Sequence, residues 1–307
     1  MQSVLDQLEG GSRVAVVRLR SLGDCVLTTP ALEILKRSRP DLQVAVVVDD
    51  AFREIFQGNP DVFITLGRQL IPLRVWRPHL CINFHGGPRS ARMTAFSGAR
   101  FRAGFEHFRH DWAYNLRIPS AQQILGVDRK VHTAEHLASA MFCLGAERCE
   151  IPGAKLIADG KSEMPRPYAV IHPFATGKGK AWPAARFQAV AEHLNRSGLD
   201  VVVIGSKQDF VGPRSTSATG PTRILAGAPL SEVKRLLSGA SLFIGNDSGP
   251  AHMAAAFGLP VVVLFGASDP EVWAPWRTPS EALVSRDITR IEVRQVLDAL
   301  ARLRVHA

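Results

Sequence analysis

Short apolar runs that alternate with amphipathic stretches constrain the fold of this chain more than any other feature. Residues 13–18, 43–48 and 80–84 are rich in β-branched side chains and bounded by polar residues, as is typical of buried strands. Stretches with helical periodicity follow the first two runs, at residues 30–38 and 50–57. This alternation predicts βαβ units that build a parallel sheet.

A second series of the same kind occupies the C-terminal half. Its expected strands are residues 168–173, 200–206, 241–246 and 260–266, and its expected helices are residues 184–198, 230–240, 249–258 and 288–304. Between the two series, residues 157–168 contain Gly, two prolines and charges, a composition typical of a linker. A chain of 307 residues is long enough for two domains. We therefore expect an α/β protein of two doubly wound, Rossmann-like domains, at residues 1–160 and 168–307, that face a central cleft.

The pattern is weakest at residues 100–130, which are aromatic and basic without a clear period. A helix is expected after them, at residues 130–146, and carries His132 and His136 four positions apart. Because no third ligand is evident, a structural role is favoured over a metal site for this pair. In the weak segment, His107 and His110 are interpreted as surface residues, with contact to an acceptor as the alternative.

Composition limits the class of protein and its compartment. The chain is 46% hydrophobic and 21% charged, as is usual for globular proteins, and no apolar run is long enough to span a bilayer. The N-terminal residues lack the basic start and apolar middle of a signal peptide. The cysteines show no CxxC or zinc spacing, which favours free thiols in a reducing compartment: Cys25, Cys81, Cys143 and Cys149. We expect a cytoplasmic protein.

The net charge of +9, from 37 Lys and Arg against 28 Asp and Glu, favours an anionic partner. Phosphorylated ligands and an anionic membrane face fit this charge better than nucleic acid, because the cations are spread along the chain and only two tyrosines are present to stack on bases. We expect no nucleic-acid partner and a transient contact with the inner membrane face. A basic protein without a charged partner remains the alternative.

Three loops at expected strand ends carry candidate site residues, and the first is RLRSLGDCVLTTPAL. Asp24 is interpreted either as a general base or as a helix cap. Thr29 and Pro30 are typical of an N-cap followed by the first helical residue, and a helix that began there would leave Asp24 free for chemistry. Arg18 and Arg20 are expected either to anchor an anionic acceptor or to lie in solvent.

The second loop, IHPFATGKGKAWP, contains Thr176 and Lys180 among small residues. Backbone N–H groups and a lysine in such a loop suit a phosphate, although the P-loop pattern is absent. A solvated basic turn is the alternative.

The third loop, GNDSGPAHMAAAFG, contains Asp247, Ser248 and Gly249 before a helix with small residues, and His252 lies in its first turn. The start of this helix offers N–H groups and a positive dipole end to a pyrophosphate. Turn and cap roles for the polar residues, with His252 on the surface, are the alternative.

Taken together, the three loops resemble the signature regions of glycosyltransferase family 9, the ADP-heptose:lipopolysaccharide heptosyltransferases and their relatives. The resemblance runs from about residue 13 to the end of the chain, and the D-S-G-P-x-H stretch with the early G-D…T-P is specific in combination. It implies a GT-B fold with the acceptor mainly on the first domain and the nucleotide sugar mainly on the second. It also implies inverting, metal-independent transfer of a heptose from ADP-heptose to a hydroxyl of an anionic lipopolysaccharide core, without a cofactor.

The same resemblance implies roles for individual residues. On the donor side it implies that Lys180 binds phosphate, with Thr176 nearby in the same loop. It implies a donor-binding turn formed by Asp247, Ser248, Gly249 and His252. Leu230 is implied to contact the adenine and Asp209 the ribose. For the acceptor side it implies that Asp24 is the catalytic base and that His85 and Arg89 belong to the acceptor-side loop. Phe174 and Ala175 depart from the Gly-Ala or Thr-Thr that many members have in the second loop.

Other functions remain open on the residues alone. An NAD(P)-dependent oxidoreductase shares the fold class, but R-L-R-S-L-G-D after the first strand fits G-x-G-x-x-G poorly. A non-catalytic relative that binds sugar nucleotides would have the same loops, and another nucleotide sugar or acceptor would use the same chemistry. No DxD triplet occurs, so cations and the helix end would have to hold the diphosphate.

Overall fold

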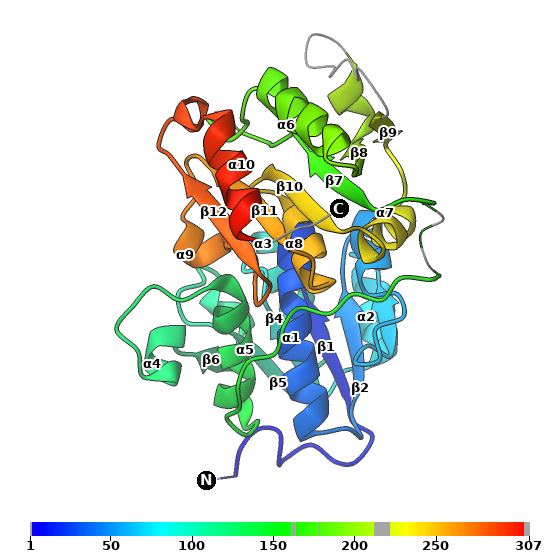
Figure 1. Cartoon of the computed structure of the whole chain (residues 1–307). Helices are drawn as coiled ribbons and strands as arrows, with labels where there is room; N and C mark the ends of the chain where they lie inside the picture. The colour runs from blue at the N-terminus through cyan, green and yellow to red at the C-terminus, as the bar shows by residue number, and fades with distance from the viewer. Residues whose placement is uncertain (1, 161, 163, 178, 212–221, 304–307) are drawn as a thin grey trace. The chain divides into compact units, whose positions relative to one another are not determined.

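The computed structural model describes residues 2–160, 162, 164–177, 179–211 and 222–303. The chain divides into two compact units, Met1–Ile157 and Ala158–Ala307. Each unit contains its own sheet of six parallel strands with helices packed on it (Figure 1). The predicted α/β fold with two parallel sheets is therefore confirmed. Residues 161 and 163 of the expected linker, and Lys178, lie outside the described residues.

The first unit has the strand order β3-β2-β1-β4-β5-β6. Its strands are β1 (Arg13–Val17), β2 (Gln43–Val47), β3 (Ile64–Leu66), β4 (Leu80–Asn83), β5 (Phe101–Phe105) and β6 (Leu116–Ile118). Its helices are α1 (Leu22–Ser38), the 3-10 helix η1 (Asp50–Ile55), α2 (Leu70–Trp76), α3 (Pro88–Ala95), the 3-10 helix η2 (Asp111–Ala113), α4 (Ala121–Leu125) and α5 (Thr133–Leu144). The stretch without a clear period thus contains two short strands, and residues 50–55 form a 3-10 helix in place of the expected α-helix.

Helix α1 begins eight residues before the predicted start at Pro30, directly after the β1 loop. Proline lacks an N–H, so the carbonyl of Val26, four residues earlier, loses its helical partner. The hydroxyl of Thr29 replaces it by donating to that carbonyl over 2.8 Å, and Thr29 also accepts from the N–H of Lys155 over 2.8 Å. The prediction of a helix start at Thr29 and Pro30 is therefore wrong, because a side chain compensates for the proline.

Both faces of the first sheet are covered by helices. Helices α1 and α5 lie side by side on one face (Figure 1). On the other face, Leu73 of α2 and Met93 of α3 join one core cluster with Ala15 and Val17 of β1. Because side chains alternate along a strand, β1 contributes to both faces and is buried from Val14 to Val17.

The second unit has the strand order β12-β11-β10-β7-β8-β9. Its strands are β7 (Tyr168–His172), β8 (Asp200–Gly205), β9 (Thr222–Ala226), β10 (Leu242–Asn246), β11 (Val261–Phe265) and β12 (Ser280–Val284). Its helices are α6 (Ala184–Arg196), the 3-10 helix η3 (Lys207–Phe210), α7 (Leu230–Ser238), α8 (Gly249–Ala256), α9 (Pro270–Trp273), the 3-10 helix η4 (Ile288–Arg290) and α10 (Val293–Arg302). Counted within each unit, the strand order is 3-2-1-4-5-6 in both, which is the Rossmann order.

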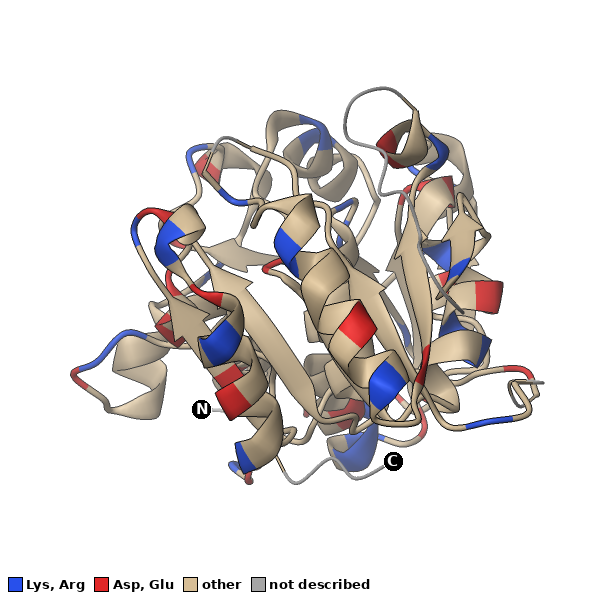
Figure 2. Ribbon diagram, turned by 45° about the horizontal axis from the view of Figure 1, so that its top comes forward, with Lys and Arg blue, Asp and Glu red and all other residues tan. Residues whose placement is uncertain are grey.

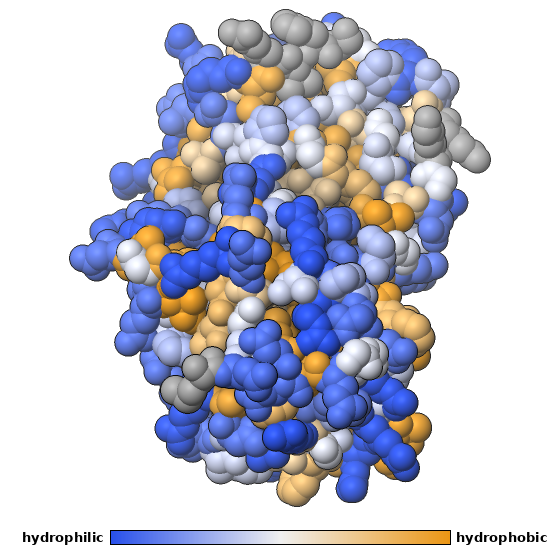
Figure 3. Space-filling model, turned by 90° about the horizontal axis from the view of Figure 1, so that it is seen from below, coloured by the Kyte–Doolittle hydropathy of each residue, from blue (hydrophilic) through white to orange (hydrophobic). Residues whose placement is uncertain are grey.

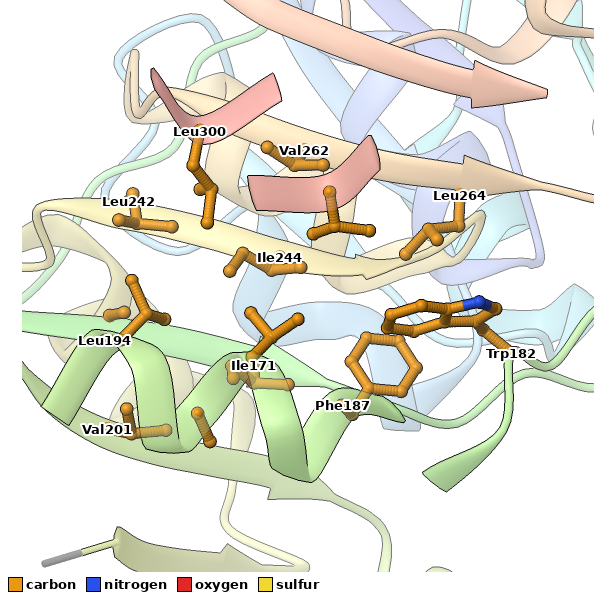
Figure 4. Close-up of a cluster of buried hydrophobic side chains, with 14 of the residues drawn as sticks. Ile171, Trp182, Phe187, Leu194, Val201, Leu242, Ile244, Val262, Leu264 and Leu300 are labelled. Carbon is orange, nitrogen blue, oxygen red and sulfur yellow. The ribbon is translucent and has the colours of Figure 1, made fainter. Parts of the chain in front are cut away.

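The core of the second unit fixes the end of the second candidate loop. Trp182 lies against Phe187 in the cluster between α6, α10 and the sheet, with ring centroids 4.9 Å apart (Figure 4). Its indole Nε1 donates to the carbonyl of Ile291 over 2.8 Å, so this buried ring satisfies its polar atom. The residues that precede Trp182 are thereby attached to the core at one end.

Among the described residues, no helix combines the length and the apolar character that a membrane crossing requires.

Candidate active site

The topology of the first unit brings two of its loops together. In an open parallel sheet, ligands bind beyond the carboxyl ends of the strands where the strand order reverses. In the first sheet this point lies between β1 and β4, which pair in parallel. The β1 loop leads into α1 with Asp24, and the β4 loop contains His85 and leads into α3 with Arg89. The expected acceptor-side residues therefore meet at one sheet edge.

The Asp24 carboxylate is held on both of its oxygens. Arg18 Nη2 donates to Oδ1 over 2.5 Å, and the backbone N–H and hydroxyl of Ser21 donate to Oδ2 over 3.2 and 3.0 Å. Ser21 is the N-cap of α1, so Asp24 does serve in a capping box, and the expectation that it is free of the helix start is wrong. The side chain is 21% exposed, and a carboxylate oxygen can accept more than one hydrogen bond. Asp24 can therefore cap the helix and still receive a substrate hydroxyl.

Arg18 is buried and committed to groups of its own unit. It is 7% exposed, and its Nη1 donates to the carbonyl of Phe84 over 2.6 Å while Nη2 holds Asp24. Burial lowers the pKa of Arg18, and the Asp24 carboxylate opposes that shift. The solvent alternative for Arg18 is wrong, because this guanidinium ties the β1 loop to the β4 loop. Arg20 and Arg89 are exposed.

His85 is a half-buried imidazole near the same charges. Burial lowers its pKa, and Arg18 and Arg20 lower it further. His85 is therefore a neutral hydrogen-bonding group at pH 7, since the shift moves it away from its ordinary value of about 6.5.

Asn83, the last residue of β4, organises the His85 loop and was missed by the sequence analysis as a site residue. Its Oδ1 accepts from the backbone N–H groups of His85 and Gly86 over 2.9 and 3.1 Å. Its Nδ2 donates to Ser90 Oγ over 3.2 Å and to the hydroxyl of Tyr114 over 2.8 Å. A polar residue that ends a fully buried apolar strand is a signal that could have identified it.

His136 joins this edge from α5. Its ring stacks on Phe105 at the end of β5 with centroids 4.0 Å apart, and His107 lies 5.5 Å from it. Burial lowers the pKa of His136 to about 4, helped by His107 and Arg18. His132, by contrast, is the N-cap of α5 and accepts from the N–H of Ala134 over 3.1 Å. The structural interpretation is thus correct for His132, whereas His136 lies near the candidate site.

In the second unit, the reversal of strand order lies between β7 and β10. The loops after these strands are the second and third candidate loops. Lys180 Nζ lies 3.6 Å from Asp247 Oδ2, with the two side chains 35% and 13% exposed. The structure therefore brings together the lysine and the acidic residue that the sequence analysis placed on separate loops.

Asn246 holds these two loops in register. It is fully buried at the end of β10, where its Oδ1 accepts from the backbone N–H of Trp182 over 2.9 Å. Its Nδ2 donates to the carbonyl of Pro173 over 2.9 Å. Both ends of the loop that carries Lys180 are thus bonded to one side chain of the other loop.

A partly buried histidine, His172, supports the start of α8. Ser248, its N-cap, lies 3.1 Å from His172 Nδ1 and donates to the Asn246 carbonyl over 3.0 Å. Burial lowers the pKa of His172 to about 4, which keeps it neutral at pH 7. Gly249 follows as the first residue of α8.

His252 is buried in α8. It is 4% exposed, and its ring centroid lies 6.4 Å from that of Trp273. The alternative that His252 is a surface residue is therefore wrong. Its position four residues into α8 places it behind the N-terminal turn of this helix.

The remaining donor-side candidates lie on separate elements. Thr176 is exposed, and within the described ranges no hydrogen bond links it to Lys180 or Asp247. Leu230 is the half-exposed first residue of α7. Asp209 Oδ2 accepts from the backbone N–H and hydroxyl of Ser206 over 2.8 and 2.7 Å, which makes it a cap of η3.

Phe174, which departs from the usual family pattern, has a packing role. Its ring lies 5.1 Å from that of Phe210 and lies over Gly205, where an added Cβ would be 2.7 Å from it. The aromatic residue thus fills space between the ends of β7 and β8.

The described part of the chain contains no cluster of three or more His, Cys, Asp or Glu side chains that could hold a metal ion.

Comparison with known proteins decides the family. The model of glycosyltransferase family 9 (heptosyltransferase) matches residues 74–298. The chain belongs to glycosyltransferase family 9. A lipopolysaccharide heptosyltransferase 3 of Escherichia coli is 28% identical over 297 residues, which cover 84% of each chain. The resemblance inferred from the three loops is confirmed, and the protein is a glycosyltransferase.

Solved structures agree on the fold of this family 9 enzyme. A glycosyl transferase family 9 protein from Veillonella parvula superimposes with a TM-score of 0.83 at 22% identity, covering 95% of this chain and 97% of its own. An E. coli heptosyltransferase with ADP-2-deoxy-2-fluoro heptose superimposes with a TM-score of 0.77 at 18% identity, covering 94% and 99%. The GT-B fold with Rossmann-like domains is therefore confirmed.

Proposed function

We propose that this glycosyltransferase moves a heptose from ADP-heptose to a hydroxyl of an anionic lipopolysaccharide core, with inversion at the anomeric carbon and without a metal ion. The E. coli relative is named a lipopolysaccharide heptosyltransferase, and a solved family structure contains an ADP-heptose analogue. The observation that carries the mechanism is the Asp24 carboxylate, held by Arg18 and Ser21 at the reversal point of its sheet. An acid of fixed orientation in this place is what a general base requires.

The second unit is assigned to the donor. Lys180 and the N-terminus of α8 provide positive charge at one sheet edge, and both suit a diphosphate. Asp247 orients Lys180, while Ser248 and Gly249 form the turn that the phosphates approach. Leu230 and Asp209 are assigned to the adenine and the ribose, and Thr176 to the rim of the phosphate loop.

The first unit is assigned to the acceptor. Arg20 and Arg89 are exposed at the edge where Asp24 lies, so they are available to an anionic sugar, whereas Arg18 serves Asp24. His85 presents a neutral imidazole beside them. We assign Arg18 as a positioning residue, because its guanidinium fixes the orientation of the carboxylate.

The chemical step breaks one bond and forms one. The acceptor oxygen attacks the anomeric carbon as the bond from that carbon to the phosphate oxygen breaks, and the hydroxyl proton passes to Asp24. A hydroxyl is too weak an acid to ionise beforehand, so the proton moves as the new bond forms. Attack opposite the leaving group inverts the anomeric centre.

The departing ADP gains negative charge during this step. Lys180 and the N–H groups at the start of α8 are directed to that charge. They stabilise it most when their positions are fixed before the reaction. Asn246 supplies that rigidity by joining the two loops. We infer that these groups meet the need that a metal ion meets in other sugar transferases.

The test is transfer with defined substrates. The protein is incubated with ADP-heptose and a lipopolysaccharide core acceptor, ADP release is measured, and the anomeric configuration of the product is determined by NMR. We expect an inverted product and full activity in excess EDTA. Retention of configuration, or loss of activity in EDTA that a divalent cation restores, would contradict the mechanism.

A thermal-shift comparison of ADP-, UDP-, GDP- and CMP-sugars tests the donor separately. A ligand that binds only the native state raises its stability by mass action. We expect the largest shift with the ADP-sugar, and a larger shift with another nucleotide would reassign the donor.

A further inference from the structure

One segment of the first unit has an unusual charge composition. Residues 62–105 contain no Asp, Glu or Lys, whereas basic and acidic residues are interspersed on the other elements (Figure 2). The segment does contain arginines: Arg68, Arg74, Arg77, Arg89, Arg92, Arg100 and Arg102. It covers β3, α2, β4, α3 and β5.

The same segment exposes large apolar side chains. Ile71 is 76% exposed, Val75 72%, Phe63 65% and Phe96 55%. In the view from below in Figure 3, hydrophobic residues reach the molecular surface between hydrophilic ones. Single exposed apolar residues are ordinary, but several on adjoining elements of one face mark an interaction surface.

Helices α2 and α3 present these residues on one face. Both pack on the same side of the sheet, because Leu73 and Met93 belong to one core cluster. Ile71, Arg74 and Val75 share the outward side of α2, since residues three and four apart are neighbours on a helix. We call the outward sides of α2 and α3, with the exposed Phe63 of the loop before β3, the α2–α3 surface.

The outward side of α3 has the same character. Arg89, Arg92 and Phe96 follow one another at spacings of three and four residues, and all three are exposed. At the edge of the segment, Arg68 lies 3.4 Å from the carboxylate of Asp49. Each helix thus offers apolar side chains next to guanidinium groups.

Contacts of Trp76 with Phe63 and Arg13 support the apolar part of this surface. The ring of Trp76 lies 5.7 Å from that of Phe63, and Arg13 lies over the Trp76 ring at 5.5 Å. Arg13 also donates to the Trp76 carbonyl over 2.8 Å. The end of α2 is therefore fixed to the first strand, so the exposed residues project from a supported element.

We propose that the α2–α3 surface docks on an anionic lipid bilayer. Arginines are attracted to the negative surface potential of such a bilayer, and side chains like Ile71 and Val75 gain by entering the headgroup and acyl boundary. A second copy of this chain is disfavoured, because two surfaces with arginines and no acid would repel each other. Nucleic acid is disfavoured because the two most exposed apolar side chains of the surface, Ile71 and Val75, are aliphatic and cannot stack on bases.

The α2–α3 surface lies near the acceptor side of the first unit. The choice of a lipid as the partner rests in part on the function proposed above. Helix α3 begins directly after the loop with His85, and Arg89 lies at its start. A bilayer bound to α2 and α3 would therefore adjoin the acceptor side of the first unit. A lipid-anchored acceptor could then be reached without leaving the membrane.

The test is flotation of the full chain with phosphatidylcholine vesicles. One set contains about 30 mole per cent of the anionic lipid phosphatidylglycerol and the other set contains none. We expect binding to the anionic vesicles and at least tenfold weaker binding to the neutral ones. Each cation near the surface contributes about fivefold in partitioning, so Arg74→Glu should weaken binding by about twentyfold or more. Ile71→Ser with Val75→Ser should weaken it about tenfold, including at high salt, where the charge contribution is screened.

Matched variants in the second unit serve as controls. Val284 is 55% exposed and Arg290 is 82% exposed, and both lie outside the α2–α3 surface. Val284→Ser and Arg290→Glu should leave binding unchanged. Equal losses in the control variants, equal binding to neutral vesicles, or no vesicle binding would overturn the proposal.

Turnover separates this proposal from the proposed function. The surface variants should retain ADP release on a water-soluble, deacylated acceptor and lose it on the same acceptor anchored in vesicles. Vesicle binding without any transferase activity would contradict the proposed function and leave the docking surface supported. Equal loss on both acceptors would show that the variants act on the fold and would overturn the docking role.

Discussion

The Asp24 carboxylate combines two roles that look exclusive in the sequence. It accepts from Ser21 at the helix start and from Arg18 on its other oxygen. The cap fixes the backbone at the third helical residue, and the guanidinium fixes the side-chain torsion. A general base gains from this arrangement, because its contact with the attacking oxygen must be made at a defined distance.

His136 makes the stability of the protein sensitive to acid. Its pKa is lowered to about 4 by burial and by the nearby His107 and Arg18, against about 6.5 in the unfolded chain. The unfolded state therefore binds the proton first, and stability falls as the pH decreases from about 6.5 towards 4.

Replacement of His136 by Phe should reduce this acid sensitivity while it retains the stacking on Phe105. The free energy of unfolding, measured by urea titration at pH 7.5 and pH 5, should fall less in His136→Phe than in the wild type. The difference is at most about 1.4 kcal/mol for each pH unit below the unfolded pKa. His172 and His85 have lowered pKa values too, so part of the dependence should remain. An unchanged pH dependence would contradict the shift at His136.

The fourth strand of each sheet ends in a buried asparagine that builds the neighbouring loops. Asn83 holds the His85 loop of the first unit, and Asn246 joins the two donor loops of the second. Both are fully buried. At the reversal point of a parallel sheet, an amide can donate and accept at once, so it satisfies the backbone groups that the strand end leaves open.

Asn246→Ala should lower both stability and nucleotide affinity. The change leaves the Trp182 N–H and the Pro173 carbonyl without their partner, and each unsatisfied buried group costs about 1–3 kcal/mol. We expect weaker ADP binding by isothermal titration calorimetry because the loop with Lys180 loses its anchor. Asn83→Ala is the matched control: it should destabilise the first unit and leave ADP affinity unchanged. Equal ADP affinity in both variants would contradict the role given to Asn246.

The sequence predicts the buried central strands well and the short peripheral ones poorly. Strands β1, β2, β4, β7, β8, β10 and β11 have continuous apolar runs, because helices cover both of their faces. Strands β3, β6, β9 and β12 lie at or near the sheet edges, are partly exposed and lack such runs. The predicted start of α1 was wrong because the Thr29 hydroxyl donates to the Val26 carbonyl in place of the missing Pro30 N–H, and this side-chain bond does not show in the sequence pattern.

The candidate site follows the same division. Residues of the loops after the central strands could be located from the sequence, because those loops must meet at one sheet edge. The Lys180–Asp247 pair and the Arg18–Asp24 pair both join residues selected in that way. His136 was noted only as one of a histidine pair, because its contact with Phe105 comes from another element of the fold and does not show in the pattern of its own helix. His172 was not predicted as a site residue, because its partner Ser248 lies in another loop.

The molecule as a whole repeats one plan. Each unit has six parallel strands in the same order and a hydrophobic core of its own. Units with separate cores can unfold separately, and a ligand stabilises the unit that binds it.

Differential scanning calorimetry should therefore show two unfolding transitions, and ADP should raise the temperature of one of them. Asn246→Ala should lower the transition that ADP raises, and Asn83→Ala should lower the other. A single transition that both variants shift equally would contradict separate units. A shift of both transitions by ADP would contradict the assignment of the donor to the second unit.

Asp24→Asn tests the proposed mechanism most directly. The amide keeps the size of the side chain and cannot take up the acceptor proton, so single-turnover transfer should fall at least about a hundredfold. The dissociation constant for ADP-heptose should remain within about twofold, since the donor is assigned to other residues. Ser21→Ala is the control, because it removes one hydrogen bond at the same helix start, while Arg18 and the backbone N–H of residue 21 still hold the carboxylate. If Asp24→Asn transferred the sugar as fast as the wild type, the assignment of Asp24 as the general base would be wrong.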